Sequence, residues 1–242
     1  MTPCGLYIHV PFCPQICPYC AFASVAGRLE SHHAYTEAIC REIEAGPHLS
    51  GPLHTVFFGG GTPTQVEPRL LAQMLATAKS HFGLAENVEI TIEANPGTVD
   101  REKFAGLRAL GCNRISIGAQ AFNDADLKLL GRIHSVDDID RAFCAARASG
   151  FENVSLDLIA DMPGVSQTHW RHSVDRAIDL APEHLSVYSL TIEENTHFAT
   201  RRREGRLSKV PDDQQADTLK WTAERLREAG YEHYEVSNYA RP

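Results

Sequence analysis

Long hydrophobic runs are absent from this 242-residue sequence. No apolar stretch approaches the roughly 18 residues that a membrane-spanning helix needs. The first ten residues also lack the charged start and the long apolar core of a secretory signal peptide. We therefore expect a protein without a transmembrane segment that works in the cytoplasm.

Basic charge is scarce. Lysine and arginine number 23 against 31 aspartates and glutamates, which gives a formal net charge of −8. A chain with this balance has no general attraction for phosphate backbones, so we expect no nucleic-acid partner. The one basic run, Arg201 to Arg203, is interpreted as a solvated loop or as the start of a helix.

Compositional extremes are missing as well. With 43% hydrophobic residues, 17 glycines and 13 prolines, the chain is neither collagen-like nor disordered, and its length suits a single α/β barrel. Seven cysteines is an odd number and a poor basis for a disulfide framework. Three of them, Cys13, Cys17 and Cys20, fall close together, and clustered thiols in a reducing compartment point to a metal site.

Short β-branched runs alternate with longer stretches of helical spacing along most of the chain. This alternation is typical of parallel βα units. The predicted strands are residues 6–10, 55–58, 88–94, 114–119, 153–159 and 184–191. The predicted helices are residues 32–45, 68–82, 100–110, 124–130, 136–149, 167–180 and 211–229, and residues 231–239 alternate like one more strand.

Each of the six predicted strands ends in a polar residue or a turn. Parallel βα units form either a barrel or an open doubly wound sheet, and ligands bind at the carboxyl ends of the strands in both. Six strand ends that each contribute a polar residue or turn to one binding site suit a barrel better than an open sheet, whose site lies in a single crevice. We therefore predict an α/β fold with a parallel partial (β/α)6 barrel. The strand-end residues are His9, Gly59 to Thr62, Glu93 with Asn95, Gln120, Asp157 and Thr191.

The cysteine cluster has the spacing C-x3-C-x2-C and directly follows the first predicted strand. Three thiolates on one loop can bind zinc, copper(I) or an iron–sulfur cluster. Structural zinc needs a fourth ligand, and Cys4 and His9 are the nearest candidates. Three cysteines on a [4Fe–4S] cluster would leave one iron open to an outside ligand. The spacing favours the cluster and leaves zinc and chance clustering as alternatives.

Several residues at the predicted mouth have chemistry of their own. Gly59 to Gly61 would let a ligand approach the backbone, although a triple glycine alone is a flexible turn. The planar guanidinium of Arg132 suits a carboxylate, although an isolated arginine is more often a solvated ion pair. Glu93, Gln120 and Asp157 could hold hydroxyl or amino groups, and could equally be capping or turn residues.

With this cysteine motif after the first strand, the chain resembles the radical S-adenosylmethionine (SAM) superfamily. Further segments occur in the order of one branch, which contains oxygen-independent coproporphyrinogen III oxidase and a heme chaperone of porphyrin metabolism, and the resemblance covers essentially the whole chain. The segments are YIHVPFC at 7–13, FGGGTPT at 58–64, IEANP at 92–96, IGAQAF at 117–122, LGRIHS at 130–135 and DLI at 157–159.

The resemblance implies a [4Fe–4S] cluster on the three cysteines and SAM chelating the open iron, where electron transfer cleaves SAM to methionine and a 5′-deoxyadenosyl radical. It places Tyr7 beside the sulfonium, Tyr19 beside adenine and the backbone of Thr191 on adenine. The implied SAM-binding residues are Tyr7, Tyr19, Gly60, Gly61, Thr62, Glu93, Gln120, Arg132, Asp157 and Thr191.

Two departures separate the oxidase from the chaperone. The oxidase has a further cysteine where this chain has Phe22, and it has an extension before the first strand. The resemblance therefore implies a heme chaperone that passes heme to acceptors such as respiratory proteins and needs an electron donor. The alternative is a radical enzyme that oxidises a tetrapyrrole or transfers a methyl group.

The heme-binding H-N-x-x-Y-W motif of the chaperones does not occur in these residues. We therefore expect a truncated chain, with a radical SAM barrel at residues 1–200 and a helix and strand at 201–242 that lead into a missing C-terminal α+β domain. Heme binding is expected to need that missing region, and the last strand is expected to leave an exposed apolar patch.

Overall fold

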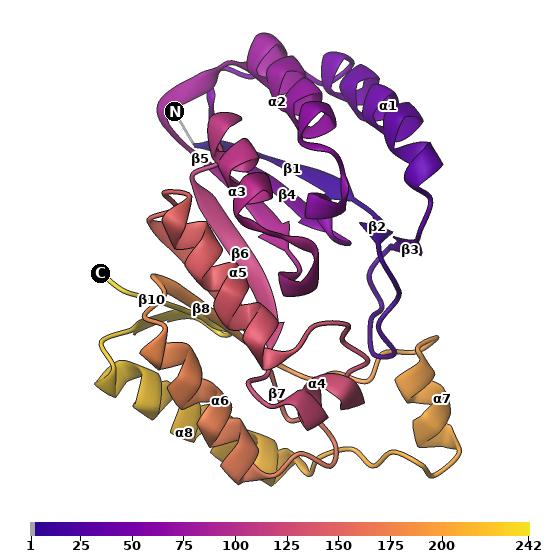
Figure 1. Ribbon diagram of the computed structural model, residues 1–242, viewed down its shortest axis with the longest axis vertical. Coiled ribbons are helices and arrows are strands. Elements are labelled where there is room, and N and C mark those ends of the chain that lie inside the picture. Colours follow the sequence, from indigo (N-terminus) through magenta and orange to yellow (C-terminus); the bar gives the residue numbers. More distant parts are fainter. Residues whose placement is uncertain (1–2) are drawn as a thin grey trace.

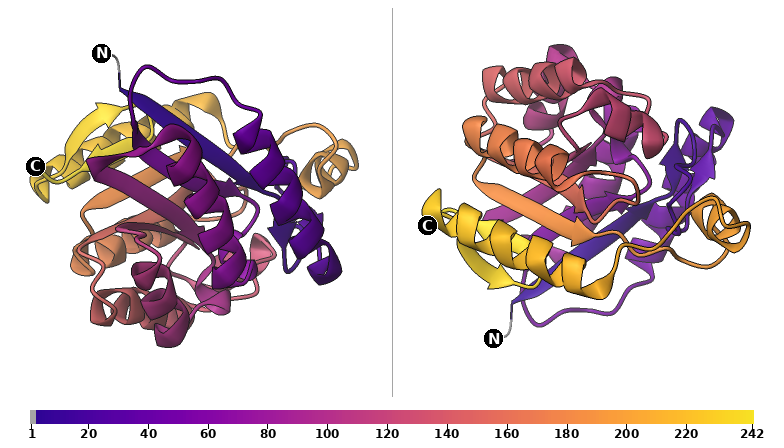
Figure 2. Two further views of the ribbon diagram at one scale, coloured as in Figure 1. Left: turned by 90° about the horizontal axis from the view of Figure 1, so that it is seen from above. Right: turned by 90° about the horizontal axis from the view of Figure 1, so that it is seen from below.

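The computed structural model describes residues 3–242, which form one curled sheet with helices outside it (Figures 1 and 2). The sheet has eight strands in the order β1-β4-β5-β6-β7-β8-β10-β9. Its strands are β1 (Cys4–Val10), β4 (Leu53–Gly60), β5 (Leu84–Ala94), β6 (Arg114–Gln120), β7 (Asn153–Ala160), β8 (His184–Ser189), β9 (Glu232–Glu235) and β10 (Asn238–Ala240).

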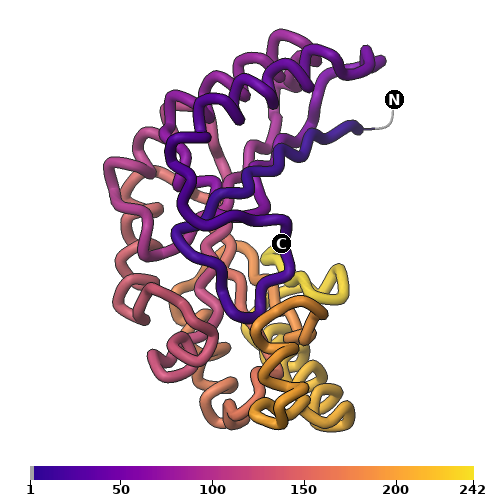
Figure 3. Tube along the Cα trace, turned by 90° about the vertical axis from the view of Figure 1, so that its right-hand side faces the viewer, coloured from indigo at the N-terminus to yellow at the C-terminus, as the bar shows by residue number. Residues whose placement is uncertain are grey.

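The first six strands of this order run parallel to one another. Since β1 and β9 are the two edges of the sheet, the barrel is open on one side. Figure 3 shows the chain as an arc that begins with the indigo strand β1 and ends in the yellow C-terminal segment. The predicted α/β fold with a parallel partial barrel is confirmed.

The helices follow the strands in sequence, as parallel βα units require. They are α1 (His32–Glu44), α2 (Pro68–Phe82), α3 (Arg101–Ala109), α4 (Asp124–Leu129), α5 (Val136–Ala148), α6 (Gln167–Asp179), α7 (His197–Arg203) and α8 (Asp212–Glu228). Short 3-10 turns lie at Leu29–Ser31, Pro63–Gln65 and Pro96–Thr98.

Side-chain caps set where several helices begin. Asp100 accepts a hydrogen bond from the backbone N–H of Lys103 at the start of α3. Ser135 and Asp138 form a capping box at the start of α5. Each cap satisfies backbone N–H groups that have no partner within the helix, and the predicted starts of α3 and α5 lie within a residue of the observed ones.

Alternate residues of the parallel strands face opposite sides of the sheet. On β7 the apolar set Val154, Leu156 and Leu158 is fully buried and belongs to one hydrophobic core with the helices. The other set contains Ser155 and Asp157 and faces the inside of the arc. The same alternation on the other strands, with Ile90 and Ile92 against Thr91 and Glu93 on β5, gives the half-barrel a polar inner face.

The end of the chain differs from the prediction of one strand at 231–239. The segment forms the β9–β10 hairpin, because the carboxylate of Glu235 accepts hydrogen bonds from the backbone N–H of Ser237 at 3.0 Å and from the side chain of Asn238 at 2.6 Å, which closes the turn. Tyr234 and Val236 remain 62% and 76% exposed. β10 pairs with β8, so this hairpin extends the main sheet.

Two further sequence interpretations need correction. β8 ends at Ser189, so Thr191 lies beyond the strand rather than at its end. The basic run Arg201 to Arg203 forms the last turn of α7, a helix that the periodicity missed. Thr196 caps its start, and cations in the last turn are favoured by the helix dipole. None of the helices in residues 3–242 has the length and apolar character of a membrane span.

Candidate functional site

The three clustered cysteines lie on a loop that follows β1. The stems of this loop are joined by a small parallel sheet of β2 (Phe12–Cys13) and β3 (Val25–Ala26). Val25 donates a backbone hydrogen bond to Pro11 at 2.9 Å, and Gly27 donates one to Cys13 at 3.0 Å. This closure holds the stems together. Cys13, Cys17 and Cys20 are half-buried free thiols within it.

The glycine run after β4 packs directly against one stem of the cysteine loop. Gly61 and Thr62 donate backbone hydrogen bonds to Val10 and Phe12 at 2.8 and 2.7 Å. A Cβ atom on Gly61 would lie 2.7 Å from the backbone of Pro11, so only glycine fits this approach. The hydroxyl of Thr62 lies 3.7 Å from the sulfur of Cys13 and donates toward it.

Arg132 reaches the other side of the cysteine loop from the segment between α4 and α5. Its Nη1 lies 3.6 Å from the sulfur of Cys17 and 3.4 Å from the hydroxyl of Tyr19. Its Nη2 donates to the carbonyl of Gly118 at 3.1 Å. Its Nε is buried and has no partner among the described residues. A buried guanidinium with an unused donor fits a carboxylate ligand, because both ends of such a pair form directed hydrogen bonds.

Side chains of the cysteine loop also contact the backbone of the arginine segment at Gly131. Gln15 donates from its side chain to the carbonyl of Gly131 at 2.5 Å. A Cβ on Gly131, whose φ is 66°, would lie 2.5 Å from Cδ of Pro18. Phe198 of α7 donates a backbone hydrogen bond to Pro18 at 2.9 Å, and its ring lies 6.2 Å from that of Tyr19. The cysteine loop is therefore held between the arginine segment and α7.

Two carboxylates face the inside of the barrel next to the glycine run. Glu93, near the end of β5, accepts a hydrogen bond from the backbone N–H of Gly60 at 3.0 Å. Burial, with the nearby carboxylate of Asp157, raises the pKa of Glu93 to about 7. Asp157 accepts from the hydroxyl of Ser116 at 3.0 and 3.1 Å, and burial raises its pKa to about 6. Two crowded carboxylates of this kind would be stabilised by a cationic ligand.

Tyr7 is 57% exposed on the same inner face and stacks on Phe57, with ring centroids 5.8 Å apart. Burial of the phenol, followed by the charge of Glu93, raises its pKa, so the hydroxyl stays protonated. That hydroxyl lies 3.5 Å from Nδ1 of His9, whose Nε2 lies 2.7 Å from the carbonyl of Ala23. Tyr19 is also kept protonated, since burial raises its pKa.

The last predicted site residues occupy different places. Gln120 ends β6 with a φ of 70°, and its side-chain nitrogen would meet a Cβ on Gly118 at 2.7 Å. Thr191 is exposed in the segment between β8 and α7 and, within residues 3–242, makes no hydrogen bond to the other predicted site residues. The remaining predicted residues lie together at the carboxyl ends of the parallel strands, where they contact one another or sit on neighbouring strands.

Sequence reasoning passed over several residues that build this mouth. His134 stood in a motif without an assigned role, and His9 was considered only as a strand-end residue and a possible zinc ligand. Gly118 and Gly131 were only part of motifs. Gln15 carried no signal at all. Within residues 3–242, no three His, Cys, Asp or Glu side chains are arranged to hold a single metal ion.

Comparison with known proteins gives consistent results. The family model of the radical SAM superfamily matches residues 7–177. The chain is 41% identical to the heme chaperone HemW of Synechocystis sp., over 100% of this chain and 60% of that protein. It is 39% identical to the heme chaperone HemW of Escherichia coli, again over 100% of this chain and 64% of the relative. The chain thus spans about 60% of the length of these relatives.

The solved structures agree on the fold. Coproporphyrinogen III oxidase (HemN) from Escherichia coli, described as a radical SAM enzyme, superposes with a TM-score of 0.86 at 28% identity, covering 99% of this chain and 56% of that one. The archaeal Elp3 of Methanocaldococcus infernus superposes with a TM-score of 0.63 at 18% identity, covering 92% of this chain and 54% of that one, and shows the fold alone.

Proposed function

The chain belongs to the radical SAM superfamily, and from that membership we propose that it binds a [4Fe–4S] cluster and SAM as part of a heme chaperone. Cys13, Cys17 and Cys20 are the proposed cluster ligands. One observation carries the proposal more than any other, namely that the buried guanidinium of Arg132 has a free donor beside Cys17 and Tyr19.

The thiols fit the cluster by their chemistry and their placement. Sulfur ligands select iron–sulfur clusters, and three cysteines leave one iron of four for an outside ligand. All three thiols are half-buried on a loop whose stems are fixed by hydrogen bonds, so they can converge on one cluster without opening the fold. When bound, the cluster supplies one electron to the sulfonium of SAM.

The surrounding residues fit the parts of SAM. In our proposal Arg132 holds the carboxylate, and the Gly60–Thr62 backbone lies along the methionine chain. Glu93 and Asp157 hold the amino group and a ribose hydroxyl, and Gln120 contributes a further polar contact. Tyr7 lies beside the sulfonium, and Tyr19 and Thr191 border the adenine. The close approach of the backbone at Gly61 and the paired carboxylates support this assignment.

These residues bind and orient a ligand, and they also control protons. The protonated phenol of Tyr7 donates toward His9 without carrying charge. Glu93 and Asp157 are partly protonated near neutral pH, and a cationic ligand would replace these protons. The buried Nε of Arg132 has no partner among the described residues, and a carboxylate would supply one. A ligand that has both a carboxylate and a cationic group would therefore satisfy Arg132 and the two carboxylates together.

Heme transfer is the proposed role because of the named relatives. Heme chaperones HemW are 35–41% identical to this chain, whereas the oxidase HemN is 28% identical. Phe22, 74% exposed, stands where the resemblance places a fourth cysteine in the oxidase. We propose that the whole protein delivers heme to acceptor proteins in the cytoplasm and receives electrons from a donor. Within this chain, the proposed division is a radical SAM barrel at 1–200 and a helix and strand segment at 201–242.

A second function is favoured by the structural match to HemN, with its TM-score of 0.86. It is an oxidase-like radical enzyme that acts on a tetrapyrrole. The two functions separate when the reconstituted protein is reduced with SAM and a porphyrinogen, and 5′-deoxyadenosine is measured. Intact SAM together with heme binding supports the chaperone. Release of 5′-deoxyadenosine that depends on the porphyrinogen contradicts it and supports the enzyme.

A further inference from the structure

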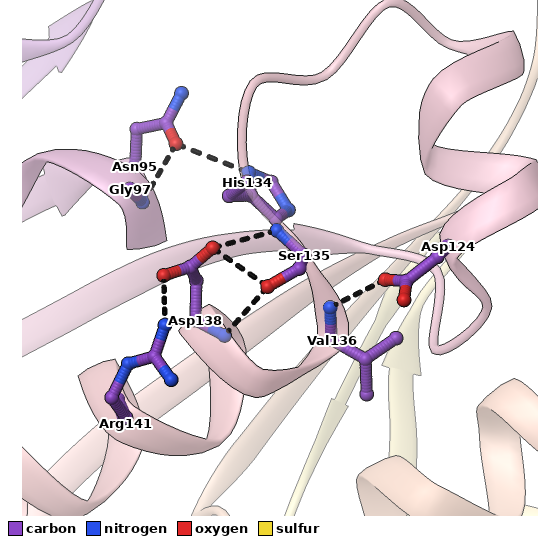
Figure 4. A network of polar contacts seen from close by, with 8 residues as sticks. All are labelled: Asn95, Gly97, Asp124, His134, Ser135, Val136, Asp138 and Arg141. Carbon is purple, nitrogen blue, oxygen red and sulfur yellow. Dashed lines mark hydrogen bonds and ion pairs between the residues drawn. The ribbon is translucent and has the colours of Figure 1, made fainter.

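His134 is 4% exposed, although it lies in a connecting segment between two helices. Its Nδ1 lies 3.1 Å from the side-chain oxygen of Asn95, just beyond β5, and its Nε2 lies 3.2 Å from the carbonyl of Ala119 on β6. Figure 4 shows the ring of His134 facing the amide of Asn95. The side chain of His134 thus connects the segment that carries Arg132 to the ends of two neighbouring strands, β5 and β6.

Both partners of His134 are hydrogen-bond acceptors. The side-chain oxygen of Asn95 accepts from the backbone N–H of Gly97 at 3.3 Å, which fixes the direction of the amide. A neutral imidazole can donate to only one of two acceptors. Burial, with the charge of Arg132, lowers the pKa of His134 to about 4, against the opposing carboxylates of Asp138 and Asp124. At neutral pH the ring therefore donates one hydrogen bond and rests close to the other acceptor.

The segment that carries Arg132 is fixed at both of its ends. At one end Gly131 has a φ of 66° and the N–H of Arg132 donates to Leu127 at 2.9 Å, which terminates α4. At the other end Ser135 and Asp138 cap α5, and the N–H of Val136 donates to Asp124 at 2.8 Å (Figure 4). These contacts fix the segment to helices. Between them, the side chain of His134 contacts the sheet at Asn95 and Ala119, and the guanidinium of Arg132 contacts it at Gly118.

We propose that His134 is a positioning residue for Arg132. It holds the guanidinium beside the carboxyl ends of the strands, where the carboxylate of SAM would bind. The inference rests on the proposed function, because it concerns the same site. Arg132 reaches Gly118 on β6, and His134 bonds to Ala119 on the same strand. A shift of the segment relative to β6 would therefore move the guanidinium and the cysteine loop apart.

The test is the affinity for SAM of the reconstituted full chain, measured by equilibrium dialysis. His134→Leu removes the donated hydrogen bond and the second polar contact, and is expected to weaken SAM binding by about tenfold, the effect of one buried hydrogen bond. His134→Gln can donate to one acceptor and is expected to stay within about threefold of the wild type. Ser135→Ala is the matched control, because it weakens the helix cap and leaves both contacts of His134 in place.

A second comparison separates positioning from a general loss of structure. In the Arg132→Ala background, His134→Leu should change the SAM affinity by less than about twofold, because the group it positions is gone. Asn95→Ala removes one partner from the other side and should weaken binding in the wild-type background. This variant keeps the test available if His134→Leu does not fold.

Three results would overturn the inference. They are wild-type affinity in His134→Leu, an equal loss in Ser135→Ala, and an unchanged tenfold effect in the Arg132→Ala background. The proposed function fails separately, when the wild-type chain itself does not bind SAM. If the wild-type chain binds SAM and the His134 variants bind it equally well, only the role of His134 is rejected.

Discussion

Arg132 and Cys17 are 115 positions apart in the sequence, and the guanidinium of the first lies 3.6 Å from the sulfur of the second. The contact joins the loop after β1 to the segment after α4. It also brings a fixed positive charge next to a thiol that we assign to a cluster.

Each of the three loop cysteines should be required for the cluster. Replacing Cys13, Cys17 or Cys20 with serine removes one soft ligand, and we expect the iron content after anaerobic reconstitution to fall from about four irons per chain to less than about one. Cys144→Ser is the control, since this cysteine is exposed on α5, away from the loop. Iron retained in all three loop variants would reject the assignment.

Arg132 should dominate recognition of the carboxylate. Arg132→Lys keeps the charge but loses the planar fork, so we expect SAM affinity to fall by about tenfold, and by about a hundredfold in Arg132→Ala. Dialysis against SAM measures both. Arg171→Ala is a suitable control, because this arginine lies over the ring of Trp221 on the outside of the fold. If Arg132→Ala and Arg171→Ala bind SAM equally well, Arg132 is not the carboxylate ligand.

The carboxylate pair should make SAM binding depend on pH. The pKa of Glu93 is raised to about 7 and that of Asp157 to about 6, so protons compete with a cationic ligand below these values. We expect affinity for SAM to rise between about pH 5.5 and about pH 7.5 and then to level. Glu93→Gln should weaken binding and flatten the upper part of this rise.

The same pair predicts the opposite trend for the stability of the ligand-free chain. A carboxyl group with a raised pKa in the folded state contributes stability below its unfolded pKa and loses it as the pH rises through the folded value. The contribution of Glu93 and Asp157 to unfolding free energy should therefore fall between about pH 4 and about pH 7. Denaturation of the Glu93→Gln variant should show a smaller decline, and an equal decline would contradict the assigned pKa shift.

Asp161, just after β7, tests backbone strain away from the mouth. Its φ is 57°, its exposure is 9%, and one carboxylate oxygen has no hydrogen-bond partner among the described residues. Asp161→Gly and Asp161→Ala both remove the carboxylate and its 2.6 Å bond from Ser189, but only glycine relieves the left-handed backbone. We expect Asp161→Gly to be more stable than Asp161→Ala by about 1 kcal/mol in chemical denaturation. Equal stability would show that the backbone is not strained there.

Much of the fold follows from the sequence, because buried strands and capped helices leave local signals. The alternation of Val154, Ser155, Leu156 and Asp157 on β7 already separates the core from the inner face. The β9–β10 hairpin did not follow, because its turn is closed by the side chain of Glu235 rather than by glycine or proline. Helix α7 was missed because it is short and its buried contact is made by Phe198 alone.

The candidate site was predictable to a different degree. Strand-end residues such as Glu93 and Gln120 were found because parallel strands direct their carboxyl ends to one edge. The roles of Gln15 and His134 could not be found this way, because each depends on a contact with a distant part of the chain, Gly131 in one case and Asn95 and Ala119 in the other. Such contacts arise only when the cysteine loop and the arginine segment are folded together.

The central claim is that three cysteines hold a cluster with one iron open to SAM beside Arg132. The most direct measurement is the electron paramagnetic resonance spectrum of the anaerobically reconstituted and reduced chain, recorded before and after SAM is added. We predict a [4Fe–4S] signal that changes when SAM is added and does not change in Arg132→Ala at the same SAM concentration. A chain that takes up zinc instead of iron, or a cluster signal that SAM leaves unchanged, would contradict the account.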